Sequence, residues 1–300
     1  MEEKNKILLE KLDSIIGIRE FMYANSIRRG IFNKIKRFIL IPEFPLTYLF
    51  YKLGLIKSID RKLFFGRRIK MQIKDLESCL FGNFQIFLEL NLVKFFIKNL
   101  KSSDIFYDIG ANYGSYTYLA LEICKEVHAF EPINYMYEAI KNNATNEINN
   151  KKLFLNCVAL SNKNGIENFY LCKDYSGCSS LILNPKNADT IKVSTITLNE
   201  YLKNHNPPSI IKMDVEGAEK LVIEGGLNFF KKNSPIITME VWSKDNNGEI
   251  SMKAVELLRS IGYQSYYIDI SGEIHKINGD LSEFVMKNEN ISDNFVFKKE

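Results

Sequence analysis

The sequence lacks several features that would place a protein in a specific class at once. Its 300 residues contain only five cysteines, an odd number with no C-x-x-C spacing and no histidines at metal-binding intervals. This usage argues against a disulfide scaffold or a zinc site, and it favours buried thiols in a reducing compartment. The first residues are charged and no apolar run follows them, so we expect no signal peptide and a cytoplasmic protein.

Long apolar runs and a strong charge of one sign are also missing. The most apolar window, residues 38–56, is interrupted by Pro42 and Pro45 and carries Glu43 and Lys52. Because a membrane-spanning helix needs about 20 unbroken apolar residues, we predict none. The net charge of +4 is too mild to indicate nucleic acid without a local basic patch, so no nucleic-acid partner is expected.

Strand-like and helix-like segments alternate regularly after residue 104. Runs of β-favouring residues cover 105–110, 127–132, 152–160, 210–215 and 234–242. Helical patterns separate these runs, which predicts parallel strands joined by right-handed crossovers in a doubly wound α/β sheet. Two later runs, 263–270 and 294–299, are candidate sixth and seventh strands.

The alternation pauses between residues 161 and 196. Two β-like runs, 166–172 and 191–196, lie on either side of a stretch rich in polar residues. The segment is too long for a simple loop, so it predicts an insertion of β type before the fourth strand of the sheet.

Residues 1–75 differ from the rest and predict a helical N-terminal extension. Within it, residues 27–40 place apolar side chains on one helical face and basic side chains on the others. Such a basic amphipathic helix suits either packing on the main domain or peripheral contact with an anionic membrane. The alternating segments belong to a separate domain over residues 76–300.

The most informative stretch is YDIGANYGSYT, residues 107–117. A predicted strand ends in Asp108, and the chain turns through Gly110 and Gly114 into a helical pattern. Ligands of open α/β sheets bind where the strands end, beside helix N-termini that favour anionic groups. A dinucleotide fingerprint would have a second glycine where Asn112 stands, and Asp108 would repel a pyrophosphate. An acid suits an ammonium or a sulfonium instead, and S-adenosylmethionine carries both.

A second acid, Glu131, ends the next predicted strand. That position reaches ribose hydroxyls, and a carboxylate can accept hydrogen bonds from both of them. The pattern D-x-G-x-x-x-G by itself also describes a tight turn with a capping Asp. Combined with Glu131, it predicts a site for S-adenosylmethionine.

Six segments, taken in order, resemble the FkbM family of S-adenosylmethionine-dependent methyltransferases. They read YDIGANYGSYT, HAFEP, NCVALSN, STITLNEYL, IIKMDVEGAEKLVIEGG and IITMEVW. The resemblance covers about residues 80–300, and KMDVEGAE is its most specific piece. It implies a methyltransferase domain over 76–300 with a class I, Rossmann-like sheet that is mostly parallel and has an antiparallel last strand. It also implies O-methylation of a small molecule, notably a sugar, and polysaccharide biosynthesis, because many bacterial relatives act on surface glycans.

The resemblance also implies which residues contact the cofactor. The methionine part of S-adenosylmethionine would contact Asp108, Gly110, Asn112 and Gly114. Glu131 would hold the ribose, and Ala159 would border the adenine.

An alcohol is a poor nucleophile until its proton is shared or removed, so we expect a base or a metal ion at the ends of the fourth and fifth strands. Asp214 and Glu240 stand there. Either one of them accepts the hydroxyl proton, or the two bind a divalent cation that acidifies the hydroxyl. The metal-free version is preferred because a full ligand set cannot be named. Lys212 either pairs with a buried carboxylate or acts as a catalytic lysine.

Acceptor contacts are predicted from the insertion and from the strand ends. Tyr175, Ser179 and Ser180 are substrate contacts or part of an ordinary polar loop. Trp242 either stacks on a sugar face or packs in the core. Glu216 is a further substrate candidate, although an acid in the first turn of a helix also stabilises the helix dipole.

Two other functions compete with this interpretation. Nucleic-acid methyltransferases that modify amino groups commonly carry an N/D-P-P-Y/F turn where this chain reads KMDVEG, and no aromatic clamp for a base is evident. A non-catalytic, membrane-associated cofactor-binding module would use residues 27–40 as its anchor. The intact cofactor acids argue against that module.

Overall fold

The computed structural model describes residues 1–16, 49–74, 89–173, 176–185, 187–242, 245–288 and 294–300. The chain divides into two compact units, Met1–Leu88 and Glu89–Glu300. The predicted basic helix over residues 27–40 lies outside the described residues. No helix among those described is both long enough and apolar enough to cross a membrane.

The first unit contains one helix, in agreement with the predicted helical N-terminal extension, and a hairpin that we did not predict. The helix is α1 (Glu3–Ile16), and the hairpin joins β1 (Ser58–Lys62) to β2 (Arg68–Gln72) in antiparallel register. Each strand has only five residues, and β1 carries three consecutive charged residues, so the pair was not recognised in the sequence. The turn between them uses Gly66, which has a φ of +100° that favours glycine.

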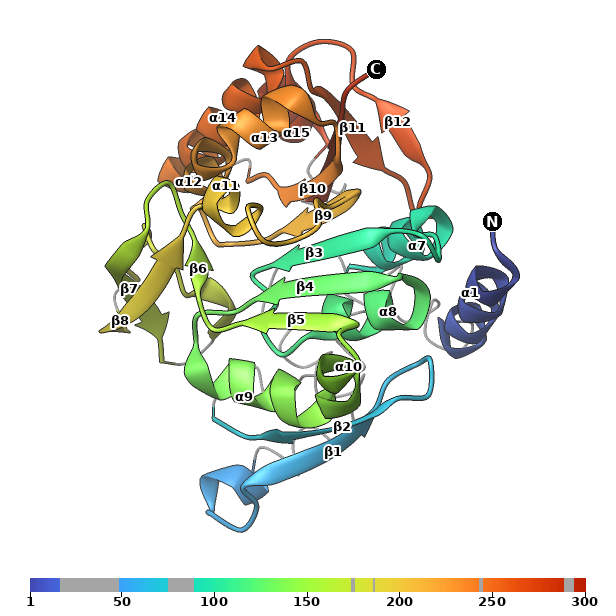
Figure 1. Ribbon diagram of the computed structural model, residues 1–300, viewed down its shortest axis with the longest axis vertical. Helices are drawn as coiled ribbons and strands as arrows, with labels where there is room; N and C mark the ends of the chain where they lie inside the picture. Colours follow the sequence, from blue (N-terminus) through green and yellow to red (C-terminus); the bar gives the residue numbers. More distant parts are fainter. Residues whose placement is uncertain (17–48, 75–88, 174–175, 186, 243–244, 289–293) are drawn as a thin grey trace. The chain divides into compact units, whose positions relative to one another are not determined.

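The second unit is built on an eight-stranded sheet with the order β12-β11-β13-β10-β9-β3-β4-β5 (Figure 1). Its parallel strands are β10 (Ile236–Glu240), β9 (Ile210–Met213), β3 (Ile105–Ile109), β4 (Glu126–Phe130) and β5 (Leu153–Asn156). At the other edge, β13 (Asn294–Lys298) pairs antiparallel with β10 and with β11 (Gln264–Ile268), and β11 pairs antiparallel with β12 (Ile274–Lys276). The predicted Rossmann-like sheet with an antiparallel last strand is therefore confirmed.

The predicted β insertion is a separate three-stranded sheet with the order β6-β8-β7. Its elements are β6 (Ala159–Leu160), β7 (Gly165–Cys172), the 3-10 turn η1 (Ser176–Cys178) and β8 (Ala188–Ile196). The long strands β7 and β8 pair antiparallel from Gly165 opposite Thr195 to Cys172 opposite Ala188. This insertion precedes β9, the fourth strand of the main alternation, as the sequence predicted.

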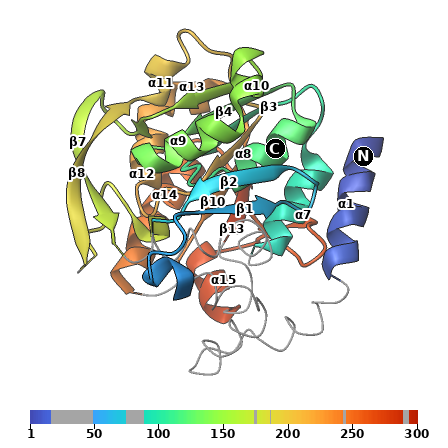
Figure 2. The same ribbon diagram turned by 90° about the horizontal axis from the view of Figure 1, so that it is seen from below.

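Helices cover both faces of the large sheet (Figures 1 and 2). One face carries α7 (Leu90–Asn99), α8 (Ser115–Ile123), α9 (Asn134–Asn143) and α10 (Thr145–Asn149). The other carries α11 (Leu198–Tyr201), α12 (Glu219–Gly225), α13 (Leu227–Lys232), α14 (Asp245–Ser260) and α15 (Leu281–Lys287). On the first face, the Phe96 ring of α7 packs edge-on against Phe106 of β3 at 5.3 Å between centroids. Such aromatic pairs add to the burial of apolar surface that stabilises the fold.

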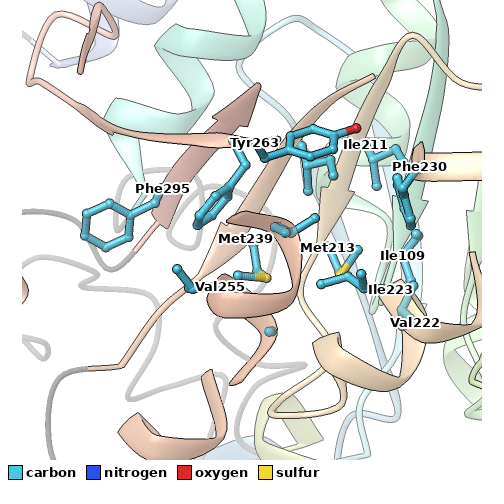
Figure 3. Close-up of a cluster of buried hydrophobic side chains, with 14 of the residues drawn as sticks. Ile109, Ile211, Met213, Val222, Ile223, Phe230, Met239, Val255, Tyr263 and Phe295 are labelled. Carbon is cyan, nitrogen blue, oxygen red and sulfur yellow. The ribbon is translucent and has the colours of Figure 1, made fainter. Parts of the chain in front are cut away.

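Alternation along the central strands separates the core from the polar site. Successive side chains of a strand point to opposite faces of the sheet. The face under α11–α15 holds an apolar cluster that includes Tyr107, Ile109, Ile211, Met213, Ile237 and Met239 (Figure 3). The intervening residues Asp108, Lys212 and Glu240 therefore lie on the opposite face, near the carboxyl ends of β3, β9 and β10.

Candidate active site

The turn after β3 is shaped by left-handed backbone at Gly110, Asn112 and Gly114, whose φ angles are +81°, +52° and +87°. A Cβ atom on Gly110 would lie 1.8 Å from the carbonyl oxygen of Asp214. No side chain fits at that distance, so Gly110 brings the turns after β3 and β9 into direct backbone contact. This contact places Asp214 beside the glycine turn.

Gly114 has a packing role that the sequence did not suggest. It is the N-cap of α8, and a Cβ there would meet Ile140 at 3.0 Å and the Tyr118 ring at 3.1 Å. The backbone conformation and the close packing both require glycine. The side chain of Asn112 accepts a hydrogen bond from the Tyr113 N–H at 2.7 Å, which stabilises the turn from within.

Glu131 connects the turn after β3 to the end of β4. Its Oε2 accepts from the Asn112 N–H and its Oε1 from the Ile133 N–H, each at 2.8 Å. The residue is buried, with 3% of its surface exposed. Because each carboxylate oxygen can accept more than one hydrogen bond, the same group can hold the turn and a ribose hydroxyl. The ribose contact itself stays a prediction.

Asp108 lies beneath the turn. Its side chain is fully buried, and its Oδ2 accepts a hydrogen bond from the Thr117 hydroxyl at 2.6 Å. Its Oδ1 is 3.8 Å from the Lys212 ammonium. Burial raises the pKa of Asp108, and the nearby Lys212 charge opposes that rise. The contact with the methionine part of the cofactor that was predicted for Asp108 stays a prediction.

Lys212 is the charged centre of the site. Its Nζ donates to Asp214 Oδ2 at 3.0 Å and to the Gly110 carbonyl at 3.1 Å, and it lies 5.2 Å from the centre of the Tyr116 ring. Burial by itself would lower its pKa, but the charges of Asp214, Asp108 and Glu89 raise it above the ordinary value. Lys212 therefore keeps its proton, so it is suited to hold Asp214 in place and poorly suited to act as a base.

Glu89 belongs to the same group of charges and was missed by the sequence analysis. It precedes α7 and accepts hydrogen bonds from the Tyr116 hydroxyl at 2.8 Å and the Asn294 amide at 2.9 Å. Burial and then the charge of Asp214 raise its pKa. The only signal in the sequence is an acid within an apolar helical stretch, which by itself is also typical of a solvated position.

Three carboxylates gather at the ends of β9 and β10. Asp214, Glu216 and Glu240 each place an oxygen within 4.8 Å of the other two, the one such group found among the described residues. Glu216 adopts a φ of +52° in a turn whose Gly217 N–H donates to Glu219. Oxygens so arranged can accept a proton from a hydroxyl or bind a divalent cation. Glu216 thus supplies the third acid that the sequence analysis did not name as a metal ligand.

The two predicted serine contacts have structural partners. The Ser180 hydroxyl donates to the Glu216 carbonyl at 2.6 Å and accepts from the Ile182 N–H at 3.0 Å. The Ser179 hydroxyl accepts from the Cys172 N–H at 3.0 Å. Both serines are buried. The substrate contacts predicted for them stay predictions.

The other predicted residues lie at the margins of the described site. Ala159 begins β6 and is 8% exposed. Trp242 is half-buried two residues after the end of β10, and its backbone N–H donates to the Ser251 hydroxyl at 3.4 Å. Tyr175 lies outside the described residues. The contacts predicted for these three residues, with adenine for Ala159 and with the acceptor for the other two, stay predictions.

Solved structures similar to this chain include several methyltransferases. Methyltransferase FkbM from Methylobacillus flagellatus KT is 13% identical with a TM-score of 0.43, and the match covers 67% of this chain and 44% of that one. A methyltransferase candidate from Streptococcus mutans in complex with SAH is 11% identical with a TM-score of 0.39, covering 71% and 97%. An rRNA methylase from Streptococcus thermophilus is 10% identical with a TM-score of 0.38, covering 69% and 93%. The search of curated proteins found none that matches.

A family model gives a more specific result. The methyltransferase FkbM domain matches residues 108–266, slightly more than half of the 300-residue chain. The match begins at Asp108 and includes Glu131 and the three carboxylates after β9 and β10. Membership implies S-adenosylmethionine as the methyl donor, in agreement with the resemblance seen in the sequence motifs. The chain belongs to the FkbM methyltransferase domain family.

Proposed function

We propose that the protein is an S-adenosylmethionine-dependent O-methyltransferase that acts on a hydroxyl of a small molecule, namely a sugar of a bacterial surface glycan. The observation that carries the proposal is a row of acids after four neighbouring parallel strands. Glu131 is bonded to the glycine turn, and Asp214 lies on the other side of that turn. Donor and acceptor sites would then share one edge of the sheet.

The charges of the site fit the proposed cofactor. Lys212 lies among Asp108, Asp214 and Glu89, and Glu131, Glu216 and Glu240 add further carboxylates at the turn and the strand ends. An acidic edge disfavours a pyrophosphate and stabilises the ammonium and sulfonium of S-adenosylmethionine. The ribose would bind Glu131, and the methionine part would bind along the turn from Gly110 to Gly114 above Asp108. Bound there, the cofactor supplies an activated methyl group.

The protein's own part of the reaction is to position the acceptor hydroxyl and to take its proton. Lys212 holds Asp214 at 3.0 Å, so this carboxylate has a fixed position at the end of β9. We assign Asp214 as the base, with Glu240 as the neighbouring alternative. A positioned base contributes about 100- to 10,000-fold in rate, and orientation of the two reactants contributes roughly 7–11 kcal/mol at best.

A divalent cation is the alternative means of activating the hydroxyl. The close approach of Asp214, Glu216 and Glu240 supports it, because three like charges are stabilised by a cation between them. The metal-free version needs only the carboxylate that Lys212 already orients. Chelation separates the two versions, and we expect activity to survive it.

Calorimetry of S-adenosylmethionine binding tests the cofactor site. Glu131→Gln should weaken affinity about 10- to 100-fold, since a hydrogen bond to a charged group contributes about 1.5–3 kcal/mol. Glu138→Gln is the matched control, because Glu138 is exposed and pairs with Lys141 on α9. Circular dichroism and thermal unfolding report whether each variant stays folded. Unchanged affinity in a folded Glu131→Gln protein would remove the basis of the proposed site.

The acceptor is tested with the labelled methyl donor. Sugars and surface glycans should become labelled on oxygen, and mass spectrometry of glycans from cells with and without the protein should show the same methyl group. RNA belongs in the same assay, since an rRNA methylase is among the similar structures. Transfer to RNA alone would replace the proposed acceptor, and absence of transfer to either would favour a non-catalytic module.

A further inference from the structure

Two cysteines of the β insertion lie in direct contact. Cys172 is the last residue of β7 and Cys178 is the last residue of η1. Their sulfur atoms are 3.1 Å apart. Sulfur is larger than carbon, yet this distance is inside the ordinary non-bonded separation of about 3.5–4.0 Å between carbon atoms. The side chains are therefore directed at each other across the loop.

Backbone pairing on the flanking residues holds the two sulfurs in this position. Tyr170 and Ser180 form an antiparallel bridge in which each N–H donates to the other's carbonyl, at 2.8 and 3.1 Å. Counting two residues forward from Tyr170 and two back from Ser180 reaches Cys172 and Cys178. The bridge thus brings the two segments together two residues away from each cysteine, with Cys178 in the 3-10 turn η1.

A side-chain hydrogen bond adds to this arrangement. The Cys172 N–H donates to the Ser179 hydroxyl at 3.0 Å, so the backbone next to both cysteines is fixed. Closing a bond between sulfurs that are already oriented requires little rearrangement of the chain. Cys172 is 9% exposed and Cys178 is half-buried, so an oxidant can reach the pair from the Cys178 side.

We propose that Cys172 and Cys178 form a reversible intramolecular disulfide. A glutathione disulfide is the oxidant class: the Cys178 thiolate attacks one of its sulfurs and releases the first glutathione thiolate. The Cys172 thiolate then attacks the mixed disulfide at Cys178 and releases the second. One S–S bond forms and one breaks, the two cysteines lose two electrons and two protons, and two glutathione thiols receive them.

The bond would join Cys172 to Cys178, two residues before Ser180 in the chain. Ser180 donates to the Glu216 carbonyl at 2.6 Å. Oxidation would thus brace the segment that supports the Glu216 turn, a consequence that rests on the proposed function. Formation of the disulfide does not rest on it. In reducing compartments, disulfides are mostly transient and redox-sensing, which agrees with a reversible bond.

The test uses the full chain, exposed to reduced glutathione and then to glutathione disulfide. After denaturation and alkylation, the reduced protein should show five modified cysteines, as its sequence holds, and the oxidised protein two fewer. Trypsin cleaves after Lys173, between the two cysteines, so the disulfide should join two otherwise separate peptides. The joined peptides should separate again when dithiothreitol is added.

Substitutions decide whether this pair is responsible. Cys172→Ser and Cys178→Ser should each abolish the linked peptide, whereas Cys124→Ser, which removes a buried thiol of the main domain, should leave it unchanged. A glutathione adduct that persists on Cys178, or a link to another cysteine, would overturn the proposal. Thiol counts do not depend on methyl transfer, so loss of the proposed function would leave this result standing.

Discussion

Glu219 shows how burial changes the behaviour of a single carboxyl group. It is 1% exposed at the start of α12, and burial raises its pKa from 4.5 to about 7. The folded protein therefore keeps a proton on Glu219 between these two pH values, while the unfolded chain releases it. Because the folded state binds more protons in this range, the contribution of Glu219 to stability falls as pH rises from 4.5 to 7.

Glu219→Gln should remove this pH dependence. Glutamine cannot ionise, and it can still accept from the Gly217 N–H through its amide oxygen. The variant should gain stability relative to the wild type as pH rises from 5 to 8, by an amount on the order of 3 kcal/mol at most. Urea unfolding at both pH values measures the difference. Glu224→Gln on the same helix is the control, and parallel pH profiles for wild type and Glu219→Gln would contradict the argument.

His128 should give the opposite sign. It is fully buried between the Tyr201 hydroxyl at 2.7 Å and the Glu126 carboxylate at 2.6 Å. Desolvation lowers its pKa from 6.5 to about 4, even though Glu126 opposes the shift. The unfolded state then binds more protons between pH 4 and 6.5, so stability is lost as pH falls through this range.

The expected result for His128→Gln is a shallower loss of stability on acidification. The variant should be less stable at pH 7, because glutamine cannot keep both hydrogen bonds, to the Tyr201 hydroxyl and to the Glu126 carboxylate, in good geometry. Its unfolding free energy should nevertheless change less between pH 6.5 and 4. The exposed His275, paired with Asp269 on the surface, supplies the control variant His275→Gln. Equal slopes for wild type and His128→Gln in urea titrations would show that His128 does not titrate in this range.

Gly110 joins the turn after β3 to the turn after β9 by direct backbone contact. Gly110→Ala should force the two turns apart, since its Cβ would lie 1.8 Å from the Asp214 carbonyl oxygen. Gly165→Ala is the matched control: Gly165 also has a positive φ, +149°, but nothing lies within 4 Å of its Cβ position. Backbone strain alone costs of order 1–3 kcal/mol, so the control should stay folded.

Comparison of the two glycine variants separates steric contact from strain. Gly110→Ala should lower the unfolding free energy by more than Gly165→Ala, and it alone should lose measurable S-adenosylmethionine affinity. Thermal unfolding and calorimetry on both proteins give these numbers. Similar losses in the two variants would mean that the contact with Asp214 has no special role.

The main strands could be predicted from sequence because turn residues bound each β-favouring run. α12 ends at Gly225, where a Cβ would lie 2.1 Å from the Ser161 carbonyl oxygen, and α13 begins two residues later. The β1–β2 hairpin, α15 and β12 consist of elements of only three to seven residues, too short for a periodic pattern to stand out in the sequence.

The site could be predicted where it follows strand ends, and not elsewhere. Asp108 and Lys212 are partners in the register of neighbouring strands, which the alternation of β3 and β9 makes inferable. Glu89 could not be found in this way. It accepts hydrogen bonds from Tyr116, 27 positions later, and from Asn294, 205 positions later, and no local pattern encodes such contacts.

At the scale of the whole molecule, net charge says little about the site. The chain carries a net charge of +4, yet the edge formed by β10, β9, β3 and β4 is acidic around Lys212. The electrostatic potential at the site is set by nearby charged groups, because salt screens charges that lie more than about 8–10 Å away. A mildly basic protein can therefore offer an acidic site to a cationic donor.

Removal of divalent cations distinguishes the metal-free mechanism, with Asp214 as the base, from the mechanism that uses a bound cation. If Asp214 is the base, EDTA should leave the rate of methyl transfer unchanged. Asp214→Asn should lower kcat about 100- to 10,000-fold with S-adenosylmethionine affinity retained. Glu216→Gln supports the EDTA result, because Glu216 is a cation ligand in the alternative, whereas Asp214 is the assigned base here. Loss of activity in EDTA that added Mg²⁺ restores, together with a large loss in Glu216→Gln, would establish the cation and refute the metal-free base.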